Sequence, residues 1–136
     1  RLDQSIPWRP GARELLTLLR ENSIKTALVT GSMHRMAQRV AEAIGFDAFD
    51  LIIGGDDVSK GKPHPESYLT AAAMLGVDPT HCVAFEDSLI GITAAEAAGT
   101  KAVGISHIVE IPAQEGRILW PTLEGVQIED LKALFK

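Results

Sequence analysis

Two adjacent acidic residues, Glu86 and Asp87, follow directly on the apolar run 82–85. Mg²⁺ prefers oxygen ligands and is commonly held by one or two carboxylates together with water and substrate phosphate. One of the two acids could instead cap the next helix while the other is exposed. Two carboxylates at the crowded end of a buried strand nevertheless favour a metal-binding role, and the pair is the candidate Mg²⁺ site.

A second group, Thr30, Gly31 and Ser32, lies between an apolar run and a helical pattern. The hydroxyl of Thr30 and the backbone N–H groups of Gly31 and Ser32 could bind phosphate oxygens, since a helix N-terminus presents unpaired donors and partial positive charge. The alternative is an ordinary strand-to-helix turn with Ser32 as its cap, and such turns are common.

Lys62 lies in a loop, 60–66, that is unusually cationic for an acidic chain. Its ammonium could offset the charge of a phosphate and of a carboxylate nucleophile. The alternative is that Lys60 and Lys62 are solvated loop charges. Pro63 and Pro65 favour a functional role, because they would hold the lysine side chain in place.

Other polar residues are weaker candidates. Asp56 and Asp57 also follow a strand, and we interpret them mainly as turn formers. His34 is close enough to Gly31 in the sequence to contact a substrate. The histidines show no metal-ligand spacing and are expected to be structural or exposed: His34, His64, His81 and His107.

Apolar runs alternate with amphipathic stretches along the chain, which is typical of repeated β-α units and a parallel sheet. We expect strands at 26–30, 51–53, 82–85 and 102–105, and helices at about 11–21, 36–44, 65–75, 88–98 and 128–135. Residues 107–125 contain two prolines and are expected to be mainly loop, with a marginal edge strand at 108–111 as the alternative. The predicted fold is a doubly wound α/β domain.

In such a sheet, ligands bind beyond the carboxyl ends of the strands. Thr30, Lys62, Glu86 and Asp87 all follow strands, so we expect them at one edge of the sheet although they are far apart in sequence. Together they have the groups that magnesium-dependent phosphoryl transfer requires, except a nucleophile.

Composition limits the classes of function. The chain has 136 residues, enough for one domain, and a net charge of -5, which argues against non-specific nucleic-acid binding. Cys82 is the only cysteine, so an internal disulfide is impossible. We find neither an apolar run near 18 residues nor a leader pattern, so neither a membrane span nor a signal peptide is expected, and the cytoplasm is the expected location.

Three short motifs carry a resemblance to a known family: 28–32 (Leu-Val-Thr-Gly-Ser), 61–66 (Gly-Lys-Pro-His-Pro-Glu) and 85–88 (Phe-Glu-Asp-Ser), with Gly91 following the last. In order and spacing they resemble motifs two, three and four of the haloacid dehalogenase superfamily. The subgroup most similar is that of β-phosphoglucomutase-like and phosphoglycolate-phosphatase-like enzymes, and the match runs from about Pro10 to Ile105.

The resemblance implies a Rossmann-like core, a Mg²⁺ ion and phosphate-ester chemistry through an aspartyl-phosphate. It assigns Thr30 to phosphate binding, Lys62 to orienting nucleophile and phosphate, and Glu86 with Asp87 to Mg²⁺. The function expected of the full-length protein is that of a phosphohydrolase acting on small phosphorylated metabolites. A phosphomutase of the same family, a non-catalytic module that binds phosphate or a partner, and an unrelated receiver-like domain remain as alternatives.

One family motif is absent. The first motif, an apolar strand ending in Asp-x-Asp-Gly-Thr, carries the nucleophile, and Asp3 does not match it. We therefore interpret 1–136 as a partial core domain that is inactive alone, and 1–10 as the remnant of a linker from a missing cap domain. The missing N-terminal segment of the same protein is an expected partner.

The absent strand would lie at the centre of the sheet, between the strands that end at Thr30 and Glu86. Its loss would leave a gap of roughly 10 Å and unpaired backbone groups that each cost on the order of 1–3 kcal/mol. We expect that the 136 residues alone do not form a stable monomer.

Overall fold

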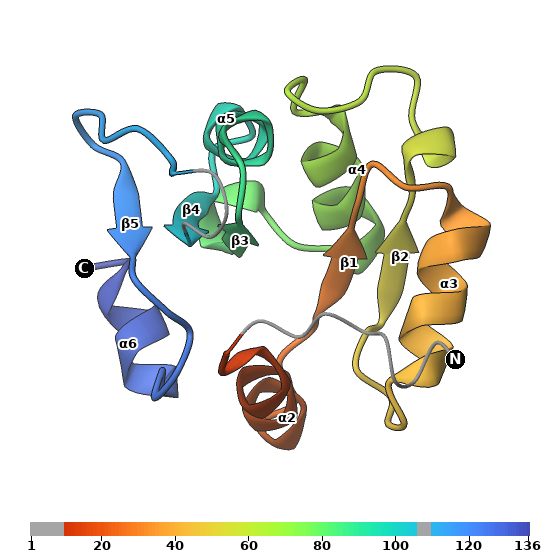
Figure 1. Cartoon of the computed structure of the whole chain (residues 1–136), viewed down its shortest axis with the longest axis horizontal. Coiled ribbons are helices and arrows are strands. Elements are labelled where there is room, and N and C mark those ends of the chain that lie inside the picture. The colour runs from red at the N-terminus through yellow and green to blue at the C-terminus, as the bar shows by residue number, and fades with distance from the viewer. Residues whose placement is uncertain (1–9, 106–109) are drawn as a thin grey trace.

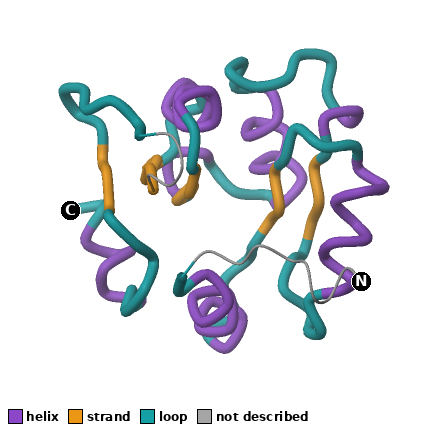
Figure 2. The backbone as a smooth tube through the Cα atoms, viewed as in Figure 1, coloured by secondary structure: helices purple, strands orange, loops and turns teal. Residues whose placement is uncertain are grey.

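The described part of the chain, residues 10–105 and 110–136 of a computed structural model, alternates between helices and strands (Figures 1 and 2). The elements are α2 Ala12–Glu21, β1 Ala27–Val29, α3 His34–Ala43, β2 Leu51–Ile53, α4 Glu66–Leu75, β3 Val83–Glu86, α5 Leu89–Ala97, β4 Lys101–Ile105, β5 Ile118–Trp120 and α6 Ile128–Ala133. Short 3₁₀ turns cover Gly55–Asp57 and Pro79–His81. The α/β class and every predicted helix are confirmed.

The predicted ends of the helices follow from their capping residues. The hydroxyl of Ser88 accepts a hydrogen bond of 3.1 Å from the N–H of Gly91 and so begins α5. Gly76 ends α4 in the left-handed conformation, with φ of 75°. Pro65, predicted within the first turn of α4, is the residue immediately before it.

All strand pairs are parallel, but they form two sheets, β1-β2 and β3-β4-β5. Within the described residues, β1 and β3 are not hydrogen-bonded to each other. In Figure 1, β1 and β2 point upward whereas β5 points downward, so the strands of the two sheets run in different directions. The two unpaired strands are those that precede Thr30 and Asp87, and a missing strand between them stays a prediction.

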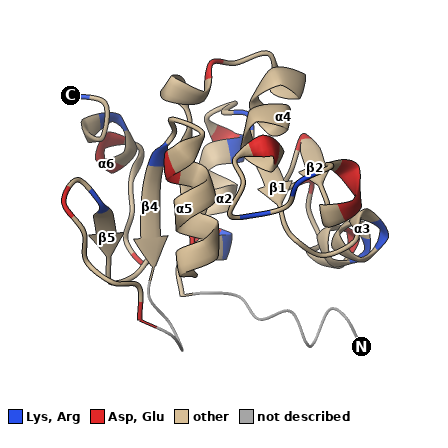
Figure 3. Ribbon diagram, turned by 90° about the horizontal axis from the view of Figure 1, so that it is seen from above, with Lys and Arg blue, Asp and Glu red and all other residues tan. Residues whose placement is uncertain are grey.

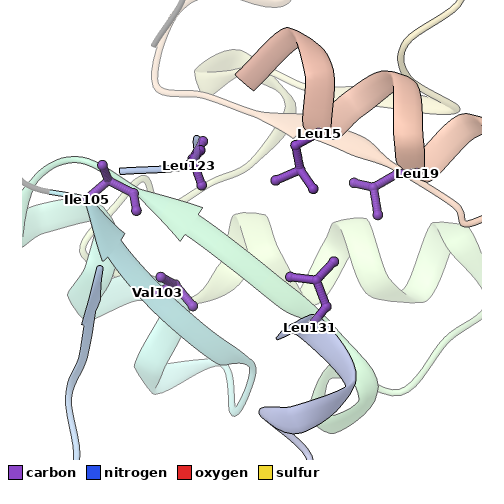
Figure 4. Close-up of a cluster of buried hydrophobic side chains, with 6 residues drawn as sticks. All are labelled: Leu15, Leu19, Val103, Ile105, Leu123 and Leu131. Carbon is purple, nitrogen blue, oxygen red and sulfur yellow. The ribbon is translucent and has the colours of Figure 1, made fainter. Parts of the chain in front are cut away.

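Helices cover both faces of the three-stranded sheet. On one face, α2 and α6 pack on β4 through a cluster of buried side chains (Figure 4): Leu15, Leu19, Val103, Ile105, Leu123 and Leu131. On the other face, Ala84 and Ala102 pack against Ile92 and Ala95 of α5. Small residues on this second face allow α5 to lie close to the strands, so the arrangement is doubly wound.

β5 was not predicted. It pairs in parallel with β4, Val103 opposite Ile118, and its Trp120 ring lies 6.1 Å from that of Phe85. Only three residues form the strand and Pro121 follows it, so its own sequence is a weak signal and β4 supplies the ladder that defines it. The alternative of a strand at 108–111 was wrong at Ile111, a buried loop residue, while residues 108 and 109 lie outside the described part.

An ion pair ties α2 to the start of both strands of the smaller sheet. Asp50 accepts hydrogen bonds from Arg20 at 2.6 and 3.2 Å and from the N–H of Thr26 at 2.9 Å. The hydroxyl of Thr26 donates to the carbonyl of Ala48 at 2.5 Å. The guanidinium of Arg20 and the N–H of Thr26 hold the pKa of the Asp50 carboxyl below its usual value.

We predict that Asp50→Asn lowers the free energy of unfolding of the natural protein that contains this chain by roughly 0.5–1 kcal/mol at pH 7, since a partly exposed pair is screened by water. A lowered folded pKa stabilises above the unfolded pKa of about 4, and this contribution disappears as the pH falls through the folded pKa. Urea denaturation between pH 2 and 7 should therefore show a shallower pH dependence below pH 4 for the variant.

Asp47→Asn is the matched control, because Asp47 is 89% exposed and its nearest oxygen lies 3.8 Å from Arg20. We expect this control to keep the wild-type profile. Identical pH profiles for Asp50→Asn and the wild type would contradict the assignment.

Candidate active site

The ammonium of Lys62 lies where the two sheets meet. It donates to the carbonyl of Val29, at the end of β1, at 3.0 Å, and to a carboxylate oxygen of Glu86, at the end of β3, at 2.5 Å. The side chains of Lys62 and Glu86 are only 14% and 9% exposed. Lys62 is therefore an enclosed ion-pair partner and not a solvated loop charge.

Tyr68 and Gly91 complete the surroundings of Glu86. The Tyr68 hydroxyl donates to the same Glu86 oxygen that binds Lys62, and the ammonium lies 5.1 Å from the centre of the Tyr68 ring. Burial and the negative charge of Glu86 raise the pKa of Tyr68, so its hydroxyl stays protonated and can donate. A Cβ at position 91 would collide with the other Glu86 oxygen, so only glycine fits there without movement.

Sequence analysis missed the role of Tyr68, which it counted only within the predicted helix 65–75. The signal available was its position, the third residue of α4, directly after the loop that carries Lys62. A tyrosine whose ring is buried normally directs its hydroxyl to a polar partner.

The two acids of the candidate metal site have different surroundings. Glu86 is enclosed and shares one oxygen between Lys62 and Tyr68, whereas Asp87 is exposed at the end of β3. Carboxylate oxygens are the donors that Mg²⁺ prefers. Within the described residues, no group of three or more His, Cys, Asp or Glu could hold a metal ion. The donor chemistry fits Mg²⁺, and the remaining ligands would have to be water, phosphate or groups beyond the described residues.

The predicted phosphate-binding group continues from β1. The N–H of Thr30 donates to the carbonyl of Ile53 at 2.9 Å, and the N–H of Ser32 donates to the Thr30 hydroxyl oxygen at 3.1 Å. The Ser32 N–H is thus engaged within the loop. A Cβ built at Gly31 would meet nothing within 4 Å, so there is open space beside that residue. Phosphate binding at this loop stays a prediction.

In the view of Figure 3, basic and acidic residues are interspersed over the elements and neither charge dominates.

Asp56 and Asp57, interpreted mainly as turn formers, also bind the backbone and the ring of His34. The loop after β2 thereby contacts the predicted phosphate-binding loop. The ammonium of Lys62, the carboxylates and the Thr30 loop therefore all lie at or after the carboxyl ends of β1, β2 and β3.

Comparison with known proteins identifies the family. A family model described as haloacid dehalogenase-like hydrolase matches residues 1–99. The chain belongs to this family.

Named relatives of this haloacid dehalogenase-like chain include a phosphatase and a phosphomutase. It is 36% identical over 103 residues to hexitol phosphatase B of Escherichia coli K12, covering 75% of this chain and 46% of that protein. It is 41% identical over 99 residues to β-phosphoglucomutase of Bacillus subtilis, covering 72% and 43%. The chain spans about half the length of the curated relatives that it matches.

A solved structure agrees with the fold. The crystal structure of β-phosphoglucomutase from Clostridium difficile superimposes with a TM-score of 0.81 at 28% sequence identity, covering 98% of this chain and 60% of that one. The haloacid dehalogenase-like assignment made from the three motifs is thereby confirmed, together with the Rossmann-like α/β core.

We predict that Tyr68→Phe destabilises the natural protein that contains this chain by about 1–3 kcal/mol, because a hydrogen bond to a charged group is lost while the ring stays. The measurement is urea denaturation at pH 7. Thr70→Val in the same helix is the control, because it also removes a hydroxyl but leaves Glu86 and its partners in place. A variant as stable as the wild type would mean that the Tyr68 hydroxyl does not hold Glu86.

Proposed function

We propose that the natural protein containing this chain is a magnesium-dependent phosphohydrolase of small phosphorylated metabolites, sugar phosphates in particular. The observation that carries the proposal is the enclosed contact of Lys62 with the Val29 carbonyl and the Glu86 carboxylate. This contact brings the motifs at 61–66 and 85–88 to the end of β1, where the motif at 28–32 lies. The sugar-phosphate enzymes among the relatives support the substrate class.

Each residue has a defined part in this proposal. The Thr30 hydroxyl and the backbone at Gly31 and Ser32 bind phosphate oxygens. The ammonium of Lys62 offsets the negative charge of the phosphate and of the attacking carboxylate. Glu86 and Asp87 hold Mg²⁺, which when bound offsets charge on the transferring phosphoryl group.

In this proposal the attacking group comes from a segment outside this sequence, because the motif Asp-x-Asp-Gly-Thr is absent from it. We propose that a segment carrying Asp-x-Asp-Gly-Thr forms the aspartyl-phosphate and that its strand fits between β1 and β3, which are not paired in the described residues. Residues 1–10 would then be the end of a linker from a cap domain. With that strand absent, we expect the 136 residues alone to be inactive and not to form a stable monomer.

A phosphomutase is the second candidate, because β-phosphoglucomutases are among both the relatives and the structural neighbours. A non-catalytic phosphate-binding module is the third, because the nucleophile motif is absent from the sequence.

Among the helices of the described residues, none has both the length and the apolar composition that a membrane span requires. A cytoplasmic location stays a prediction.

The first test is the intact mass of the natural protein, followed by a phosphate-release assay with a panel of hexose, hexitol and pentose phosphates, with and without Mg²⁺. We expect Lys62→Ala to lower kcat by about 10²–10³, the usual cost of removing a group that stabilises developing charge. Conversion of one sugar phosphate into its isomer without phosphate release would identify the mutase.

Lys60→Ala is the matched control, since Lys60 lies exposed in the same loop and its contact with Glu66, at 3.1 Å, is made by its backbone N–H, which the substitution keeps. Its activity should equal that of the wild type. Full activity in Lys62→Ala, or no turnover of any phosphate ester by a natural protein that contains the nucleophile motif, would contradict the proposal.

A further inference from the structure

The loop after β2, residues 54–57, packs backbone against backbone on the predicted phosphate-binding loop, residues 30–32, and on the residues that follow it. The N–H of Gly55 donates to the carbonyl of Ser32 at 2.7 Å. A Cβ at Gly54 would collide with the backbone of His34, and one at Gly55 would collide with the carbonyl of Gly31. Two consecutive glycines therefore allow a contact that any other residue would force apart.

Asp56 caps the helix that follows the phosphate-binding loop. Met33 at the start of α3 has no side chain able to cap, and the helix N–H of His34 donates instead to a carboxylate oxygen of Asp56 at 2.7 Å. A carboxylate is favourable there because a helix N-terminus carries unpaired donors and partial positive charge. The first amide of α3 is thus already bound to an anion of the same chain.

Asp57 joins the same two segments through side chains. One of its oxygens accepts hydrogen bonds from the N–H of Gly54 at 2.7 Å and from the His34 ring at 2.5 Å. These two donors hold the pKa of the Asp57 carboxyl below its usual range. The Gly54 bond lies within the loop that carries Asp57, so it holds in place the carboxylate that binds the ring of His34.

We propose that Asp56, Asp57 and His34 are positioning residues that hold the backbone of Thr30, Gly31 and Ser32 in the conformation that receives a phosphate group. The inference rests on the proposed function. Its physical basis is that donors aimed in advance bind an anion without the cost of ordering the loop. Because Asp56 binds the first amide of α3 and the Thr30 hydroxyl oxygen binds the Ser32 N–H, we expect the Thr30 hydroxyl and the Gly31 N–H to be the first donors to phosphate.

The test uses the natural polypeptide that contains this chain, with inorganic phosphate as the probe and the backbone amide resonances of Gly31 and Ser32 as the readout. We expect Asp56→Ala and Asp57→Ala to weaken phosphate binding about tenfold, the order seen when a group that orients a ligand residue is removed. Asp56→Asn keeps an oxygen that can accept from the His34 N–H, so we expect it to restore most of the affinity.

The matched control is Asp78→Ala. Asp78 accepts from the N–H and hydroxyl of Thr80 at 2.9 and 2.7 Å, in the turn before β3 and away from the carboxyl ends of the strands. Its loss should lower the urea midpoint to a similar degree as the loss of Asp56, with unchanged affinity for phosphate. Equal affinities in wild type, Asp56→Ala and Asp57→Ala would overturn the inference.

Failure of the proposed function gives a different result. If phosphate moves neither amide in the wild type, the loop is not a phosphate site, and the phosphate-free spectra still test the contact. Asp56→Ala should then shift the Gly31 and Ser32 resonances while Asp78→Ala leaves them unchanged, and unshifted resonances would overturn the inference. If Asp56→Ala does not fold, Asp57→Ala and Asp56→Asn decide by the same two readouts.

Discussion

The ammonium of Lys62 lies between a backbone carbonyl of one sheet and a carboxylate of the other, and the arrangement of the candidate site depends on it. Val29 and Glu86 end strands that are not paired in the described residues, so no ladder fixes their separation. A buried carboxylate without a partner would be costly, and Lys62 and Tyr68 both supply one. The same contacts that satisfy Glu86 bring the ends of β1 and β3 together.

The two faces of the sheet β3-β4-β5 are packed in different ways. Leu15 and Leu19 of α2 reach the larger sheet although α2 precedes a strand of the smaller one, so hydrophobic packing as well as the ion pair joins the two parts. On the opposite face, alanines and Gly91 let α5 approach closely, and Glu86 uses the space that the glycine leaves. Packing and electrostatics at the end of β3 therefore share one requirement, the absence of a side chain at position 91 of α5.

Negative charge near a phosphate-binding loop is normally unfavourable, yet two of the acids in this acidic chain lie beside the Thr30 loop. Each has a local partner: Asp56 the N-terminus of α3, and Asp57 the ring of His34 and the N–H of Gly54. Short-range hydrogen bonds of this kind offset the charge of each carboxylate locally. The carboxylates can therefore order the loop, and they would repel a phosphate less if one binds at the proposed site.

The sequence by itself determined the α/β class, the bounds of most helices and strands, and the family motifs, because these depend on interactions within a few residues. Ser88 caps its own helix and Gly76 ends its own, so the residues that determine these helix ends lie next to them in the sequence. The prediction that Lys62 and Glu86 meet also succeeded, because parallel strands place their carboxyl ends at one edge. Only the tertiary structure decided the strand at Ile118–Trp120, the Tyr68 contact with Glu86 and the binding of His34 by Asp56 and Asp57. Each of these joins residues separated by many positions, and their formation depends on which surfaces the packed helices and strands bring within hydrogen-bonding distance.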